Sequence, residues 1–316
     1  MIDKLIEKII EKNNPSAIGL DTQASYLPDC KGIVSNAEAA RRILDFNKAI
    51  IDATCDIVPC VKVQVAYYEM YGYEGMKAFG QTLSYASSCG LITIADVKRN
   101  DIASTARAYS KAFLGKNDLG EAAFASDFVT VNAYLGSDGI APFIEDCTEY
   151  GKGIFILVRT SNPSGKELQN LFVSLNNKML YEIMGDYVQE WGKGLIGKYG
   201  YSSIGAVVGA TCPEEAAKLR QAHPSVFFLV PGYGAQGASA KDIVVSFDDK
   251  GLGAIVNSSR AILCAYQKEQ YAHLSPAQAA RQAALAMKED IGSALKEKGI
   301  NYADLAADAR ERQWDI

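Results

Sequence analysis

Histidine is scarce in this sequence, because the 316 residues include only His223 and His273. A metal centre built on histidine would therefore find few ligands in this chain. The seven cysteines do not supply the missing ligands, since their number is odd and none of them form the short C-x-x-C spacing of zinc and redox sites. Several lie in apolar runs, where a free cysteine behaves as a small hydrophobic residue. We expect reduced thiols and no histidine-based metal site.

An excess of positive charge is also missing, because 32 basic residues face 37 acidic ones and the formal net charge is −5. This balance does not favour general binding to nucleic acid or to an anionic membrane, although it is compatible with a local site for a small anion. No apolar run reaches the roughly 20 residues that span a bilayer. Residues 1–10 have the pattern of an amphipathic helix rather than of a signal peptide. We expect a cytoplasmic protein.

Low-complexity linkers are absent as well, so we expect one domain covering residues 1–316. Short apolar runs rich in β-branched residues alternate with longer segments of helical character. Nearly continuous apolar character is typical of parallel strands that are buried on both faces. The eight predicted strands are residues 16–21, 56–64, 91–98, 128–134, 153–160, 203–209, 226–232 and 253–258.

The segments between these runs carry apolar residues at helical spacing, and the clearest are residues 37–53, 67–88 and 180–199. A further helix begins at Pro213, with acidic residues in its first turn and a predicted cap at Thr211. Strands that alternate with helices indicate βαβ units and a parallel sheet.

Eight strand–helix units predict an α/β protein with a (β/α)8 barrel, whose typical size is about 250 residues. The surplus consists of an N-terminal helix, a long loop near residues 161–174 and an Ala-rich C-terminal helical segment at 276–312. The alternative fold is a doubly wound open sheet, which would place a glycine-rich dinucleotide turn after the first strand. The sequence has Asp21-Thr22-Gln23-Ala24 at that point, which is not such a turn.

Charged residues end three successive predicted strands, and the third strand gives the most specific pattern. Asp96 and Lys98 lie two positions apart, so they would share one face of an extended chain, and Asp101 follows. Asp21 ends the first predicted strand, and Lys62 and Gln64 end the second. A lysine between two carboxylates should stay protonated and serve as a proton donor. Acid–lysine–acid runs also occur on solvated helix faces, but this one follows a buried strand, which favours a functional interpretation.

A second pattern is the glycine-rich turn at residues 231–238, which follows the seventh predicted strand. Glycines allow the backbone to approach a ligand and to present N–H groups to an anion, although they also simply permit a tight turn. Arg260 follows the eighth strand and offers bidentate donors that suit a phosphate. Phosphate sites at strands seven and eight recur in these barrels, so we expect one here.

With these residues in view, the chain resembles the orotidine 5′-phosphate decarboxylases, especially their longer (type 2) subfamily, over essentially the whole barrel. The segment Asp96-Val97-Lys98-Arg99-Asn100-Asp101-Ile102-Ala103-Ser104-Thr105 matches that family's D-x-K-x-x-D-I-x-x-T pattern. Residues 160–165, with sequence TSNPSG, resemble the subfamily's TSNP loop, and residues 231–237 resemble the family's PGxGAQG turn.

The resemblance implies decarboxylation of orotidine 5′-phosphate to UMP and CO₂ without a cofactor. Lys98 would donate the proton to C6 of the pyrimidine, and Asp96 would lie against the substrate carboxylate and hold Lys98. Asp101, Ile102 and Thr105 would reach into the neighbouring site of a homodimer with shared active sites.

The resemblance also implies residues that bind the substrate. Asp21 and Lys62 would bind ribose hydroxyls and extend the charge network, and Ser161 would hydrogen-bond the pyrimidine amide edge. The phosphate would be held by side chains and backbone N–H groups at the last two strands: Gln236, Arg260, Gly234 and Ser259.

Two other functions remain open. A decarboxylase of the same superfamily that acts on a sugar phosphate through magnesium and an enediolate would share the D-x-K-x-x-D strand. The TSNP loop and Gln236 favour a pyrimidine instead, and magnesium dependence would separate the two. A non-catalytic nucleotide-binding protein would not need Lys98 and both acids together. Residues 161–177 are our candidate for a lid over the substrate, with Gly165 permitting its motion.

Overall fold

The structure is a computed structural model, and it describes residues 1–234 and 237–300. Within these residues eight parallel strands close into a barrel in the order β1-β10-β9-β8-β5-β4-β3-β2, with helices between them in the chain. Each predicted strand overlaps one of the barrel strands, so the prediction of a (β/α)8 barrel is confirmed. The strands are β1 Ser16–Gly19, β2 Cys60–Gln64, β3 Ile92–Arg99, β4 Phe128–Val131, β5 Gly153–Arg159, β8 Ile204–Val208, β9 Phe228–Pro231 and β10 Ala254–Ser258.

The chain divides into two compact units. One unit consists of Ala17–Ile154 and Ser258–Leu285, and the other of Met1–Ser16, Phe155–Asn257 and Ala286–Ile316. The expectation of a single domain stays a prediction. The helices are α1 Ile2–Lys12, α2 Asn36–Thr54, α3 Ala66–Glu69, α4 Gly72–Ser88, α5 Ala103–Phe113, α6 Ser137–Tyr150, α7 Gly165–Gln169, α8 Leu180–Gly192, α9 Pro213–Ala222, α10 Ala240–Ile243, α11 Arg260–Leu263 and α12 Pro276–Glu297.

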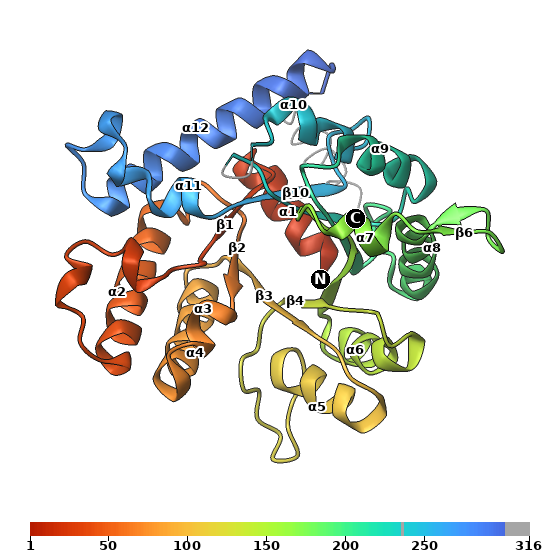
Figure 1. The fold of residues 1–316 in the computed structure, drawn as a ribbon, viewed down its shortest axis with the longest axis horizontal. Helices are drawn as coiled ribbons and strands as arrows, with labels where there is room; N and C mark the ends of the chain where they lie inside the picture. Colours follow the sequence, from red (N-terminus) through yellow and green to blue (C-terminus); the bar gives the residue numbers. More distant parts are fainter. Residues whose placement is uncertain (235–236, 301–316) are drawn as a thin grey trace, which may run out of the picture. The chain divides into compact units, whose positions relative to one another are not determined.

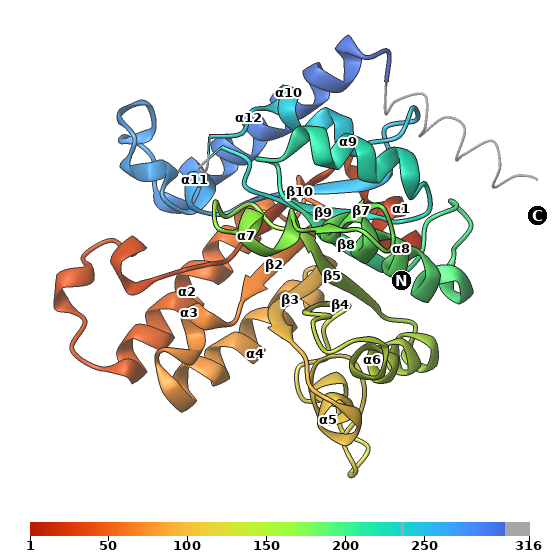
Figure 2. The same ribbon diagram turned by 45° about the vertical axis from the view of Figure 1, so that its right-hand side comes forward.

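In the unit that contains β1 to β4, the strands are buried along most of their length, as the apolar runs predict. Helix α2 begins after Ser35, whose side chain caps it by accepting the N–H of Glu38. Helices α2 and α4 pack against each other, and α5 packs against α6 (Figures 1 and 2). The predicted helix at 67–88 is in fact two helices, because Gly72 adopts a φ of +64° that a continuous α-helix does not allow.

In the other unit, α1 is the predicted amphipathic helix and buries the apolar face that includes Leu5, Ile6 and Ile9. The cap predicted at Thr211 is wrong. The N-cap residue is Cys212, and its side chain forms no capping bond. The Thr211 hydroxyl instead donates to the carbonyl of Ser161 at 3.0 Å.

The region predicted as a long loop at 161–174 is more ordered than expected. It contains α7 and β6 (Phe172–Val173), which pairs with β7 (Lys178–Met179) in a separate antiparallel hairpin. The C-terminal helix is confirmed to Glu297, and the predicted part from 301 onward lies outside the described residues. None of the helices in the described residues is long and apolar enough to cross a membrane.

Candidate active site

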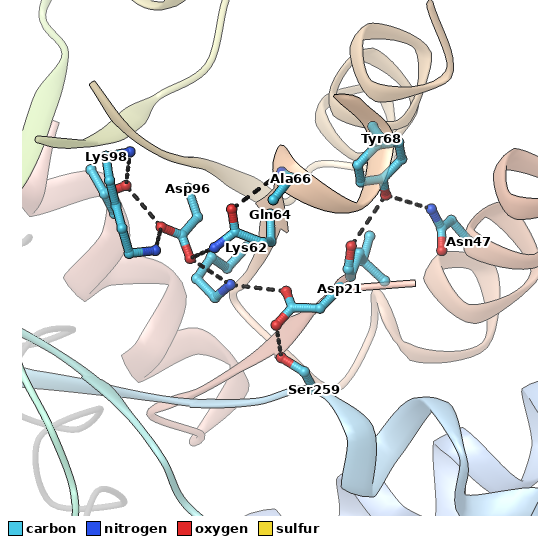
Figure 3. A network of polar contacts seen from close by, with 11 residues as sticks. Asp21, Asn47, Lys62, Gln64, Ala66, Tyr68, Asp96, Lys98 and Ser259 are labelled. Carbon is cyan, nitrogen blue, oxygen red and sulfur yellow. Dashed lines mark hydrogen bonds and ion pairs between the residues drawn. The ribbon is translucent and has the colours of Figure 1, made fainter. Parts of the chain in front are cut away.

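A network of ion pairs gathers at the carboxyl ends of β1, β2 and β3 and at the residue that follows β10 (Figure 3). Lys62, on β2, lies between two carboxylates, with Nζ 2.9 Å from Asp21 Oδ1 and 2.8 Å from Asp96 Oδ2. The second oxygen of Asp21 accepts the hydroxyl of Ser259 at 2.9 Å. All these residues belong to the unit that contains β1 to β4. The parallel register explains the contact, since Gln64 pairs with Asp96 and brings the end of β2 beside that of β3.

Asp96 is the centre of the network, and each of its oxygens accepts two hydrogen bonds. Oδ2 accepts Lys62 Nζ and, at 2.9 Å, Gln64 Nε2. Oδ1 accepts Lys98 Nζ at 2.6 Å and the hydroxyl of Thr130 at 2.8 Å. Burial alone would raise the pKa of Asp96, but the two ammonium groups outweigh it and hold that pKa well below its usual range. Asp96 is therefore ionised at neutral pH, and four hydrogen bonds fix its orientation.

Lys62 is the buried cation of the network, with only 4% of its side chain exposed. Burial would lower its pKa, but the carboxylates of Asp21 and Asp96 more than compensate and raise that pKa above its usual value. An ammonium enclosed in this way has no role as a mobile proton source. Its position indicates that it keeps the two acids together.

Lys98 differs from Lys62 because 44% of its side chain is exposed. In the described residues it forms one ion pair, with Asp96, so Nζ has further N–H donors to offer. Lys98, Asp21 and Gln64 line a cavity of about 390 Å³. An ammonium anchored on one side and open to a cavity on the other can donate a proton to an atom bound there.

The predicted contact between Asp96 and Lys98 is confirmed, but the regularly extended chain that we expected there is wrong. Lys98 has a φ of +48°, and the pairing of β3 with β4 shifts register between Ala95 and Arg99. The strand bulges at this point, and the bulge rather than the two-residue alternation directs both side chains to the same place.

Asp101 does not join the network within one chain, so the lysine that lies between two carboxylates is Lys62 and not Lys98. Among the described contacts, the Asp101 carboxylate accepts the N–H of Ile102 at 2.7 Å and forms no bond to Lys98. Ile102 and Thr105, at the start of α5, are exposed.

Within the contacts described, the other residues predicted to bind the substrate form no bond to Lys62, Asp96 or Lys98. Arg260 is exposed and opens α11, close to Ser259 in the chain. Ser161, in the other unit, is half-buried at the end of β5. Gly234, also in that unit, has a φ of +74° and donates its N–H to the carbonyl of Ala238 at 2.9 Å. Gln236 lies outside the described residues.

Two members of the network carried no predicted role. Gln64 was visible as a polar residue at a strand end, two positions after Lys62. Thr130 lies inside the apolar run of β4, where a threonine is an ordinary strand residue, and only the strand register shows that it faces Asp96. In the described part of the chain no three His, Cys, Asp or Glu side chains are grouped so as to hold a metal ion.

A parallel (β/α)8 barrel with lysines and carboxylates paired at the carboxyl ends of its strands defines a barrel enzyme, since chemistry in this fold collects at that end. The family model described as "Orotidine 5'-phosphate decarboxylase / HUMPS family" matches residues 18–274, and the chain belongs to this family.

Similar proteins agree with this assignment. The chain is 44% identical over 301 residues to "Orotidine 5'-phosphate decarboxylase" of Petrotoga mobilis, covering 95% of this chain and all of that one. It is 45% identical over 294 residues to the protein of the same name from Clostridium perfringens strain SM101, covering 93% and 98%. Among solved structures, a putative orotidine 5′-phosphate decarboxylase from Streptomyces avermitilis aligns with a TM-score of 0.77 at 29% identity, covering 93% and 95%.

Proposed function

We propose that this protein removes CO₂ from orotidine 5′-phosphate to give UMP, the last step of de novo pyrimidine nucleotide synthesis. The observation that carries the proposal is the anchored ammonium of Lys98, which is held by the ionised Asp96 and lines a cavity. The names of relatives that are 44–45% identical over nearly their whole length support the same reaction.

Loss of CO₂ from C6 leaves an electron pair in the plane of the pyrimidine ring, where no carbonyl can delocalise it as a simple enolate. Stabilisation must then be electrostatic, and a preorganised ammonium beside C6 provides it. Lys98 is assigned this role, and it transfers a proton to C6 as the C–C bond breaks. Because Lys98 is already hydrogen-bonded to Asp96, little reorganisation is needed when the charge develops.

Asp96 is assigned two roles. It orients Lys98, and it places negative charge next to the position of the substrate carboxylate, which would raise the energy of the bound substrate. Lys62 and Asp21 keep this charge in place, and Asp21 with Lys62 would also contact the ribose hydroxyls. Binding of the phosphate, remote from C6, would supply energy for orientation at the reacting carbon.

The contacts to the two ends of the substrate are proposed from the family resemblance. Ser161 would bind the pyrimidine amide edge. The phosphate would be bound by Arg260 with its permanent charge, by Gln236 and by backbone N–H groups near Gly234 and Ser259. No cofactor takes part in the proposed reaction.

We further propose a homodimer with shared active sites. Within its own chain Asp101 contacts a backbone N–H rather than Lys98, and Ile102 is 54% exposed, as expected of residues that serve a neighbouring subunit. Mixing inactive Asp101→Ala subunits with inactive Lys98→Ala subunits tests this. A shared site predicts that activity returns, because some mixed dimers contain one intact site. No recovery in verified mixed dimers would contradict it.

The reaction is tested by following the ultraviolet absorbance of orotidine 5′-phosphate in the presence of EDTA. Rapid turnover that resists EDTA supports the proposal. No turnover by the folded protein, together with magnesium-dependent decarboxylation of a sugar phosphate such as 3-keto-gulonate 6-phosphate, would assign the chain to a different reaction.

A further inference from the structure

The bulge in β3 places three residues of that strand opposite one residue of β4. Ala95 pairs with Val129 and Arg99 pairs with Val131, so β3 advances four residues while β4 advances two. Thr130 is the single residue of β4 that faces this bulge. A bulge interrupts the hydrogen-bond ladder, and the N–H of Lys98 would lack a partner unless another group supplied one.

The hydroxyl of Thr130 supplies that partner. It accepts the backbone N–H of Lys98 at 2.9 Å and donates its own proton to Asp96 Oδ1 at 2.8 Å. The direction of both bonds is certain, because an N–H can only donate and a hydroxyl has one proton. Asp96 Oδ1 also accepts Lys98 Nζ. Thr130 therefore bonds both to the backbone of Lys98 and to the carboxylate oxygen that holds the Lys98 ammonium. Thr130 is 1% exposed, and solvent has little access to either bond.

The backbone of Lys98 needs such support. Its φ of +48° lies in the left-handed region, which costs a non-glycine residue roughly 1–2 kcal/mol. A conformation of this kind persists when its surroundings hold it, and the N–H of Lys98 is held by Thr130. The direction of the Lys98 side chain follows from that backbone conformation.

We propose that Thr130 is a positioning residue for Lys98: by holding its backbone N–H and sharing Asp96 Oδ1 with its ammonium, Thr130 sets where Nζ lies in the cavity. This inference rests on the proposed role of Lys98 as proton donor. Thr130 does not line the cavity itself, so it acts through Lys98 and Asp96 and not by contact with substrate.

The test compares Thr130→Val with Thr130→Ser. Valine has nearly the shape of threonine but neither hydrogen bond, while serine keeps the hydroxyl. A displacement of about 1 Å at a reacting group can cost about 10²-fold, so we expect kcat of Thr130→Val to fall about 10- to 100-fold. KM should stay within about threefold because no substrate contact is lost. Thr130→Ser should recover most of the activity.

A matched control is Thr93→Val, at the opposite end of β3. Thr93 is as buried as Thr130, and its hydroxyl bonds to Asp127 rather than to the network. We expect Thr93→Val to lose stability but to keep kcat within about twofold, since the bonds of its hydroxyl in the described residues go to Asp127 and not to the network. If Thr130→Val does not fold, Thr130→Ala provides the same comparison without placing a methyl group against the Asp96 carboxylate.

The outcomes separate this inference from the proposed function. Wild-type turnover with full activity in Thr130→Val, or equal losses in Thr130→Val and Thr130→Ser, would overturn the inference and leave the function standing. If the wild type does not act on orotidine 5′-phosphate, a crystal structure of Thr130→Val decides. A left-handed Lys98 that still contacts Asp96 would overturn the inference, and a displaced Lys98 would support it.

Discussion

The two ends of β3 both pair an aspartate with a lysine, yet they are built differently. At the amino end, Asp127 accepts the N–H and hydroxyl of Thr93 at 3.0 and 3.2 Å, and Lys152 Nζ lies 3.3 Å away. At the carboxyl end, Asp96 accepts four side-chain donors, two of them ammonium groups.

The difference shows which ion pairs indicate chemistry. Asp127 accepts hydrogen bonds from Thr93 and so joins the starts of β3 and β4, which is a structural role. Asp96 holds a lysine whose ammonium is open to a cavity, and it depends on Lys62 to remain ionised in a buried place. An acid beside a lysine is therefore not informative by itself. Two lysines on one buried aspartate, with one of the ammonium groups open to a cavity, are informative. They lie at the end of the barrel where active sites form.

The largest effect should follow from removing the exposed cation. Lys98→Ala should lower kcat by about 10²- to 10⁴-fold, because general acid catalysis and electrostatic stabilisation are lost together. Stability should change by no more than about 1 kcal/mol, since the Lys98 side chain is 44% exposed and Lys62 still pairs with Asp96 in the variant. Initial rates and urea unfolding of the same preparation check both statements. A variant within tenfold of wild-type activity would remove Lys98 from the mechanism.

Removing the buried cation should affect folding instead. Lys62→Met leaves Asp21 and Asp96 without their shared partner, and breaking a buried ion pair typically costs about 3–5 kcal/mol. Lys152→Met, which removes the cation beside Asp127, is the control and should cost less, because both partners are more exposed than Lys62 and Asp96 and Asp127 keeps its hydrogen bonds to Thr93. Urea unfolding of the two variants measures the contrast. Equal losses would mean that the two ends are energetically alike.

The pH dependence of stability provides a third test. Because the folded-state pKa of Asp96 is lowered, its ion pairs stabilise the fold at pH values above the unfolded pKa of about 3.9. That contribution is lost as the pH falls from there through the folded pKa. In Asp96→Asn, the unfolding free energy should therefore fall less steeply below about pH 4 than in the wild type. Parallel curves would contradict the assignment of Asp96 as a buried anion.

The smallest effect should come from the amino end. Asp127→Asn keeps the shape of the side chain and weakens its hydrogen bonds, so we expect a loss of about 1–2 kcal/mol in unfolding free energy. The values of kcat and KM should each stay within about twofold of wild type. Steady-state kinetics alongside urea unfolding gives both values, and a large fall in kcat would show that the two ends of β3 are coupled.

The sequence allowed much of the fold to be predicted because buried parallel strands leave uninterrupted apolar runs, and all eight were visible. It also indicated Asp96 and Lys98, since the charges directly follow a buried strand. It could not show that Lys62 is the cation between two acids, because that depends on the register of β2 against β1 and β3. The roles of Thr130 and Thr211 were hidden for the same reason, as both depend on contacts with residues more than 30 positions away.

The charges of the network also balance. Asp21 and Asp96 contribute two negative charges, and Lys62 and Lys98 contribute two positive ones. A neutral cluster exerts little long-range attraction on an incoming anion. The network therefore positions the groups that react but does not speed the encounter with the substrate. Capture of a phosphate-bearing substrate must then depend on other cations, of which the exposed Arg260 is our candidate. Added salt should accordingly slow the encounter with substrate and leave the rate of the bound complex nearly unchanged.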